Sequence, residues 1–169
     1  MWETITDIIL ILSILTLVTF MVTGVYQWIK RKDFKKIDLQ IRWMAVPVAL
    51  VAIVYFIFDK IWVLNTRPND PSDPSFPSTH VMIVATIFFI TSMILPKYIS
   101  SRVARIILWI VITVLISLTC IGRVVSGMHW PIDVIGGLIF AFIFSEIYYQ
   151  IVKRGKKKNA KRVHKDNKR

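Results

Sequence analysis

Five long apolar runs dominate this chain of 169 residues, and they restrict its fold more than any other feature. An α-helix needs about 20 mostly apolar residues to cross a bilayer, where every backbone polar group must be satisfied internally. The chain is 55% hydrophobic, above the roughly 45–50% apolar content of soluble domains. The sequence therefore predicts an all-α integral membrane protein, a bundle of about five transmembrane helices at residues 6–29, 43–58, 79–95, 103–121 and 131–152.

These runs predict one transmembrane domain, residues 1–152, followed by a basic tail, residues 153–169. The first run opens with "MWETITD", which carries Glu3 and Asp7 in place of the basic start of a signal peptide, so we expect a retained helix. The tail is too polar to fold, and we expect it to be disordered. No aromatic residues are interleaved with its charges, so we expect binding to membrane lipids and not to nucleic acid.

Basic residues fall on alternate connections between the predicted helices. Nineteen of the 22 Lys and Arg residues lie in linker 30–42, in linker 96–105 or in the tail. With five spans these segments share one side of the membrane, which the positive-inside rule makes the cytoplasm. We therefore expect a multi-pass protein of the cell membrane. Its N-terminus and its loops at 59–78 and 122–130 would be extracytoplasmic, and the tail cytoplasmic.

The two outer loops and the helix starts beside them hold ionisable residues, which are costly at membrane depth and are read as functional by default. Three are cations, which together suit a multiply charged anion, and arginine matches phosphate with two parallel donors. Ser78 precedes the third helix, whose free N–H groups can bind phosphate, although Ser78 could equally serve only as a cap. The candidate residues are Lys60, Arg67, Ser78, His80, Arg123, His129 and Asp133.

His129 and Asp133 are four residues apart, which brings their side chains together on one helical face. A carboxylate bonded to one imidazole nitrogen fixes the tautomer and frees the other nitrogen to attack. The alternative is a histidine that is simply satisfied at a helix start. The cluster of cations and the second histidine favour the catalytic interpretation.

A metal site is a competing interpretation, since two histidines and several aspartates could bind zinc. The spacing resembles no compact ligand motif, and the three cations would oppose a divalent ion. We therefore expect no metal and no cofactor. The single cysteine, Cys120, excludes an intramolecular disulfide.

In these residues the sequence resembles the membrane type 2 phosphatidic acid phosphatases, which are related to vanadium-dependent haloperoxidases and acid phosphatases. The family signature has three parts, and the resemblance covers about residues 55–140. The parts stand here as "KIWVLNTRP" from Lys60, "PSTH" from Pro77, and "RVVSGMHWPID" from Arg123 to Asp133.

The resemblance implies that residues 1–152 are a transmembrane phosphatase domain. It would hydrolyse a lipid phosphate or pyrophosphate without a metal, through a phosphohistidine. His129 would be the nucleophile, Asp133 would orient and activate it, and His80 would protonate the leaving oxygen and then activate water. The resemblance also implies that the phosphoryl oxygens are held by Lys60, Arg67, Ser78, the backbone of Thr79, and Arg123.

Three features depart from the family pattern. Thr79 replaces the usual glycine, and its branched side chain would crowd the phosphate and narrow the substrate range. Gly122 replaces the usual serine, which removes one hydroxyl contact. The family commonly has six spans where we count five, so one helix before the first motif is expected to be missing.

Several functions remain open. Undecaprenyl pyrophosphate is the favoured substrate, with phosphatidylglycerophosphate, phosphatidate or a sphingoid phosphate as alternatives, and a lipid phosphotransferase would carry the same motifs. An anion transporter needs polar residues deep in the spans, and only Glu146 comes near. An inactive binding scaffold would be expected to have lost its histidines. Loop 69–76 is interpreted as a connector, or else as a gate for lipid entry.

Overall fold

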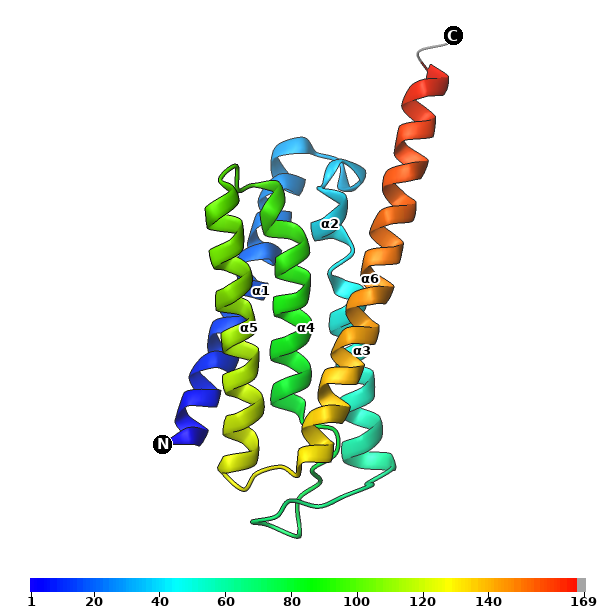
Figure 1. Ribbon diagram of the computed structural model, residues 1–169. Coiled ribbons are helices and arrows are strands. Elements are labelled where there is room, and N and C mark those ends of the chain that lie inside the picture. Colours follow the sequence, from blue (N-terminus) through cyan, green and yellow to red (C-terminus); the bar gives the residue numbers. More distant parts are fainter. Residues whose placement is uncertain (167–169) are drawn as a thin grey trace.

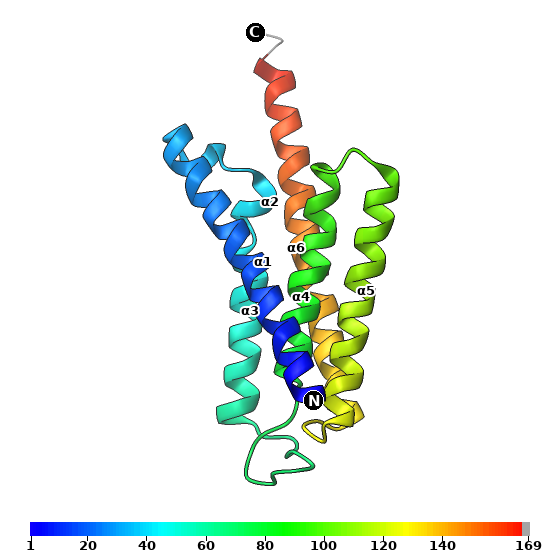
Figure 2. The ribbon, with the colours of Figure 1, turned by 90° about the vertical axis from the view of Figure 1, so that its left-hand side faces the viewer.

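A computed structural model describes the backbone of residues 1–166 and the side chains of residues 1–160. Long helices stand side by side in a bundle, and no strand forms within the described residues (Figures 1 and 2). Short helical turns lie at Phe34–Lys36, Ile57–Ile61 and Leu95–Lys97. The α-helices are α1 (Trp2–Arg31), α2 (Leu39–Arg42), α3 (Ala45–Phe56), α4 (Thr79–Ile94), α5 (Arg102–Val125) and α6 (Pro131–Asp166).

Five helical segments are long and apolar enough to cross a membrane, and each contains one of the predicted runs. The prediction of an all-α membrane protein with five spans is therefore confirmed. The second segment is composite, because the chain bends between α2 and α3 at Trp43 and Met44. Pro47 follows in the first turn of α3, where a missing N–H costs no helical hydrogen bond. The segments are Trp2–Arg31, Leu39–Ile61, Thr79–Lys97, Arg102–Val125 and Pro131–Ala160.

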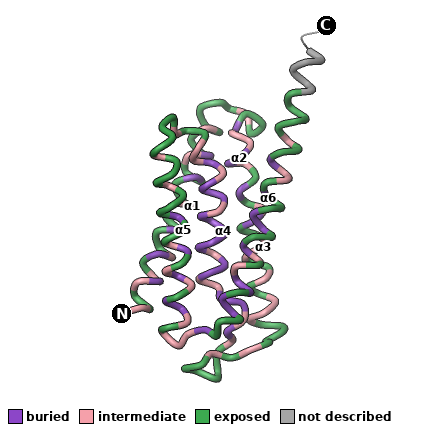
Figure 3. The backbone as a smooth tube through the Cα atoms, in the orientation of Figure 1, coloured by how far each residue is buried: buried purple, intermediate pink, exposed green. Residues whose placement is uncertain are grey.

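Helix α4 is the centre of the bundle and packs against α1, α5 and α6 (Figure 3). Val84, Ala85 and Phe88 on α4 pack with Ile9 of α1 and Ile112 of α5 in a buried cluster. Lipid tails are as apolar as these side chains, so close van der Waals packing stabilises the arrangement more than exclusion of water does.

The outer faces of α1 and α5 expose large apolar side chains. Ile8 and Met21 on α1 are each 60% exposed, and Ile110 on α5 is 58% exposed. Soluble monomers rarely expose apolar patches of more than a few hundred Å². This surface is therefore suited to lipid, as expected of a multi-pass membrane protein.

Tail 153–169 was expected to be disordered, whereas the structure shows helix as far as Asp166. Helix α6 continues through these basic residues to Asp166 (Figure 1), and residues 167–169 lie outside the described part of the chain. The sequence after Val152 is rich in Lys and Arg, which have high helix propensity. Extending a helix that is already formed avoids the unfavourable nucleation step.

The two ends of the bundle differ in composition. The N-terminus, loop 62–78 and loop 126–130 lie at one end (Figure 1). The basic linkers at 30–42 and 96–105 lie at the other end, where the C-terminal part of α6 also projects. The sequence-predicted functional residues gather at the first of these ends.

Candidate active site

Loop 62–78 is fastened to the start of α6 by a close backbone contact. The N–H of Ser78 donates to the carbonyl oxygen of Asp133 at 2.9 Å. Gly137, one turn along α6, allows this approach, because a Cβ there would lie 2.8 Å from the carbonyl oxygen of Ser78. The start of α4, which carries His80, is thereby held beside the start of α6.

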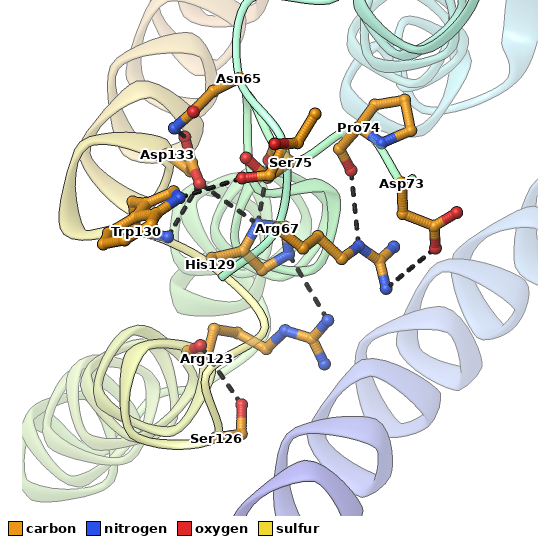
Figure 4. A network of polar contacts seen from close by, with 11 residues as sticks. Asn65, Arg67, Asp73, Pro74, Ser75, Arg123, Ser126, His129, Trp130 and Asp133 are labelled. Carbon is orange, nitrogen blue, oxygen red and sulfur yellow. Dashed lines mark hydrogen bonds and ion pairs between the residues drawn. The ribbon is translucent and has the colours of Figure 1, made fainter. Parts of the chain in front are cut away.

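His129 is buried between the two loops, and its ring is held from both sides (Figure 4). Nδ1 lies 2.9 Å from the carbonyl oxygen of Ser75. A carbonyl only accepts, so Nδ1 carries the hydrogen and Nε2 keeps its lone pair. Nε2 lies 3.5 Å from Nη2 of Arg123. Burial first, and then the charge of Arg123, lower the pKa of His129 to about 4, against the opposing effect of Asp133. The ring is therefore neutral at neutral pH and able to act as a nucleophile.

Asp133 is fully buried behind this ring. Its Oδ2 accepts from the N–H of Trp130 at 2.8 Å, and its Oδ1 accepts from Nδ2 of Asn65 at 3.3 Å. The first contact resembles half of a capping box, in which a side chain in the first turn returns to the residue before the helix. Nδ1 of His129 lies 3.8 Å from Oδ2, beyond the hydrogen-bond range of about 3.2 Å. Asp133 therefore acts on His129 as a nearby negative charge and by holding the backbone N–H of Trp130, the next residue. The carbonyl of Ser75 accepts the hydrogen bond from the ring.

Two arginines face the same cavity as His129. Arg123, at the end of α5, has a side chain only 2% exposed. Arg67 is held in loop 62–78, with Nη1 3.5 Å from Oδ2 of Asp73 and Nε 3.4 Å from the carbonyl oxygen of Pro74. The two guanidinium groups place two positive charges at this end of the cavity, which Asp59 also lines.

His80, in the first turn of α4, also lines the cavity. Its Nε2 lies 3.0 Å from Oδ1 of Asp7, which comes from the first turns of α1. The same carboxylate oxygen lies 3.8 Å from Nη1 of Arg123. The cavity thus holds two histidines, and each ring contacts a different oxygen acceptor.

The cavity has a volume of about 590 Å³ and a polar end continuous with an apolar wall. Its polar end holds His80, His129, Arg67 and Arg123, with Thr79 beside them. Its wall is built by spanning helices, α1 and α3 above all. The apolar residues of these two helices are Leu10, Ile14, Leu17, Val48, Val51 and Ala52. This shape suits a molecule with an anionic head and a hydrocarbon body.

Four buried polar atoms of residues at or beside the cavity have no hydrogen-bond partner among the described residues. They are Nε of Arg123, Oγ of Ser75, Oγ of Ser78 and Oδ2 of Asp59, the last of which lies 2.7 Å from Nζ of Lys60 as an ion pair. Leaving such an atom unpaired costs about 1–3 kcal/mol. Native structures keep few of them, and those that exist call for an explanation. An oxyanion offers several acceptor oxygens at once, and it would suit the N–H of Arg123 and the two serine hydroxyls, while Oδ2 of Asp59 already faces Lys60.

The family model of the PAP2 superfamily matches residues 56–157, which is more than half of the chain and includes all three sequence motifs. The chain belongs to the PAP2 superfamily. Its predicted resemblance to the type 2 phosphatases is therefore confirmed.

Two individual proteins resemble this PAP2 chain. An undecaprenyl-diphosphatase of Sulfolobus acidocaldarius is 33% identical over 85 residues, which are 50% of this chain and 37% of that protein. The chain thus spans little more than a third of that relative's length. A solved structure, a transmembrane PAP2 type phosphatidylglycerolphosphate phosphatase from Bacillus subtilis, superposes with a TM-score of 0.64. It is 22% identical, with 90% of this chain and 77% of that chain covered, and it shows the shared fold.

Most of the residues predicted for a PAP2 site come together. Five of them line the cavity: Arg67, Thr79, His80, Arg123 and His129. Asp133 lies behind His129, and Ser78 is buried at the start of α4.

Lys60 is the residue that the structure does not bring to the cavity. Its Nζ lies 2.7 Å from Oδ2 of Asp59, its side chain is 65% exposed, and it is not part of the lining. The competing interpretation of these residues was a metal site. Within the described residues, no group of three or more His, Cys, Asp or Glu side chains lies close enough to hold an ion.

Sequence reasoning missed three contributors to this PAP2 site. The carbonyl of Ser75 left no signal, because any residue supplies a backbone oxygen. Asn65 stood inside the spacer of the first motif, where its role was not visible. Asp7 could have been noticed, because a carboxylate at the end of a spanning helix is costly unless it has a partner.

Proposed function

We propose that this protein hydrolyses a lipid phosphate or diphosphate without a metal, through a phosphohistidine on His129. The observation that carries the proposal is the single cavity that joins two histidines and two arginines to an apolar wall of spanning helices. The phosphate would bind at the polar end while the hydrocarbon chain lies against α1 and α3. Membership of the PAP2 superfamily supports the same chemistry.

In the first half-reaction, Nε2 of His129 attacks the phosphorus atom. A phosphorus–nitrogen bond forms as the bond to the leaving oxygen breaks, and His80 gives a proton to that oxygen. Arg67 and Arg123 stabilise the charge on the remaining oxygens, which is the task of fixed donors in such transition states. Ser78, the N–H of Thr79 and Lys60 are further phosphate donors in this proposal. Lys60 would have to leave Asp59 to reach the ligand.

In the second half-reaction, His80 accepts a proton from water as the water attacks phosphorus. The phosphorus–nitrogen bond breaks, inorganic phosphate leaves, and His129 returns to its neutral form. The hydrogen bond from Nδ1 to Ser75 persists through both halves. It stabilises the ring while Nε2 is bonded to phosphorus, much as an orienting group does in other nucleophilic sites.

Undecaprenyl diphosphate is the substrate that we propose, and the name of the Sulfolobus relative supports it. The site would face the extracytoplasmic side. The concentration of basic residues at the opposite end of the bundle supports this orientation.

The test is phosphate release by the full chain purified in detergent with excess EDTA, over a panel of lipid phosphates. Wild type, His129→Ala and His164→Ala are compared. His164 lies near the far end of α6, so its loss controls for general effects of removing a histidine. We expect wild type and His164→Ala to release phosphate and His129→Ala to release none. Transfer of the phosphoryl group to a lipid alcohol without net release would indicate a phosphotransferase instead. No reaction with any lipid would overturn the proposal.

A further inference from the structure

We propose that Asp7 is a positioning residue for His80, the acid that protonates the leaving oxygen. This inference rests on the proposed function and extends it to helix α1. Asp7 lies outside residues 56–157, the part that matches the PAP2 family model.

The contact between the two residues is direct. Oδ1 of Asp7 lies 3.0 Å from Nε2 of His80. The other ring nitrogen, Nδ1, has no hydrogen-bond partner among the described residues. A carboxylate on one nitrogen fixes the ring orientation and leaves the second nitrogen for proton transfer. His80 is thus held through Nε2, which leaves Nδ1 to react. His129 is held through Nδ1, which leaves Nε2 to react.

The packing of α1 against α5 explains why Asp7 reaches the site. A Cβ at Gly122 would lie 2.5 Å from Cγ2 of Thr6, so only glycine allows this approach. Thr6 is fully buried there, and its hydroxyl donates to the carbonyl oxygen of Glu3. The next residue is Asp7, which is thereby brought beside Arg123 and His80. The glycine that departs from the family's usual serine is therefore the position against which α1 docks.

The carboxylate of Asp7 faces His80 from α1 and is opposite in charge to a protonated ring. Arg123 from α5 and Arg67 from loop 62–78 line the same cavity. In the proposed step the proton passes from Nδ1 of His80 to the leaving oxygen. Asp7 forms and breaks no covalent bond, and its negative charge is unchanged.

A purely structural role for Asp7 would be to tether α1 or to offset the charge of Arg123, which lies 3.8 Å away. The two roles differ in their dependence on the leaving group. The alkoxide of a lipid monophosphate such as phosphatidate leaves only if it is protonated, whereas p-nitrophenolate leaves without a proton. Loss of the positioning residue should therefore lower kcat/KM for a lipid monophosphate and leave kcat/KM for p-nitrophenyl phosphate unchanged.

The experiment measures kcat/KM for phosphatidate and for p-nitrophenyl phosphate in wild type, Asp7→Asn, Asp7→Glu and the matched control Glu3→Gln. Glu3 is an exposed carboxylate one turn away on the same helix, so its variant makes the same change in charge. We expect Asp7→Asn to lower kcat/KM for the lipid phosphate by about 10-fold or more, a share of the roughly 10²–10⁴ that a general acid supplies. The kcat/KM for p-nitrophenyl phosphate, which reports only the steps up to departure of the leaving group, should stay near that of wild type. Asp7→Glu should recover part of the loss, and Glu3→Gln should behave as wild type.

A double-mutant cycle with His80→Ala completes the test. If Asp7 acts through His80, Asp7→Asn has no further effect once His80 is gone. Equal losses on both substrates, or a full additional loss in the His80→Ala background, would overturn the inference while the proposed function stands. An unchanged Asp7→Asn would do the same. A wild-type protein that hydrolyses no lipid phosphate would overturn the proposed function as well.

Discussion

The carbonyl oxygen of Ser75 lies 2.9 Å from Nδ1 of His129, closer than any atom of the Asp133 carboxylate. The tautomer of the proposed nucleophile is therefore fixed by the backbone of loop 62–78. That loop is part of the site, and its Arg67 faces the same cavity. The role of Asp133 follows from this arrangement and differs from that of a directly bonded aspartate.

Asp133→Asn should retain measurable activity. The carbonyl of Ser75 still holds Nδ1–H when the carboxylate is lost, so the ring keeps its reactive tautomer. The missing charge should lower kcat by about 10²-fold, short of the roughly 10⁴-fold loss seen where the aspartate alone sets the tautomer. The measurement is kcat for Asp133→Asn beside His129→Ala. Equal inactivity of the two variants, with both folded, would show that Asp133 is indispensable and contradict this division of roles.

Acid should destabilise the fold through His129. Its pKa in the folded protein is about 4, below the ordinary value of about 6.5. Between these values the unfolded chain binds a proton that the folded protein does not, so stability is lost as the pH falls. Above both values His129 contributes no pH dependence. The thermal midpoint of wild type in detergent should therefore fall more between pH 7 and pH 4 than that of His129→Gln. Parallel curves for the two proteins would contradict the lowered pKa.

Arg123→Lys should weaken binding of the phosphoryl group although the positive charge is kept. Lysine carries a point charge, whereas the guanidinium group of arginine is a planar fork of donors. Arg123 is buried, so its surroundings are packed against the guanidinium group. We expect kcat/KM to fall by about 10²-fold, as for the loss of one fixed transition-state donor. Inorganic phosphate should also inhibit less strongly. Arg105→Lys is the matched control, since Arg105 is exposed at the opposite end of α5. If both variants behave as wild type, Arg123 does not hold the phosphate.

Gly137→Ala should destabilise the protein by about 1–3 kcal/mol, as overpacking does. The added Cβ would meet the carbonyl oxygen of Ser78 at 2.8 Å, and a backbone atom cannot move aside cheaply. Activity should fall together with stability, because the same contact holds the start of α4 beside α6. Gly155→Ala serves as a comparison, since its Cβ would meet the flexible end of Leu39. Thermal unfolding in detergent measures both effects, and equal stability of the two variants would contradict the tight backbone contact.

The helices could be predicted from the sequence because a bilayer allows little else for apolar runs of this length. The motif residues could be predicted because the motifs are defined by residue types at fixed separations along the sequence. The partners of Asp7 and Asn65 could not be predicted, since each lies far away in sequence and only tertiary packing brings it near. Lys60 had the right spacing, yet its flexible side chain is paired with its neighbour Asp59. The tail was expected to be disordered, yet α6 continues to Asp166, because a helix that is already formed extends more easily than a new helix nucleates.

The most direct test of the central claim is to trap the phosphoenzyme. Full-length protein is mixed with a lipid phosphate labelled in its phosphoryl group, quenched in base within one turnover, and digested for mass spectrometry. We expect acid-labile, base-stable phosphate on His129 alone. The phosphoenzyme should accumulate in His80→Ala with a substrate whose leaving group needs no proton, because His80 is then missing for the hydrolysis of the phosphorus–nitrogen bond. Phosphate release by wild type with no label on His129, or with label on another residue, would contradict the phosphohistidine mechanism.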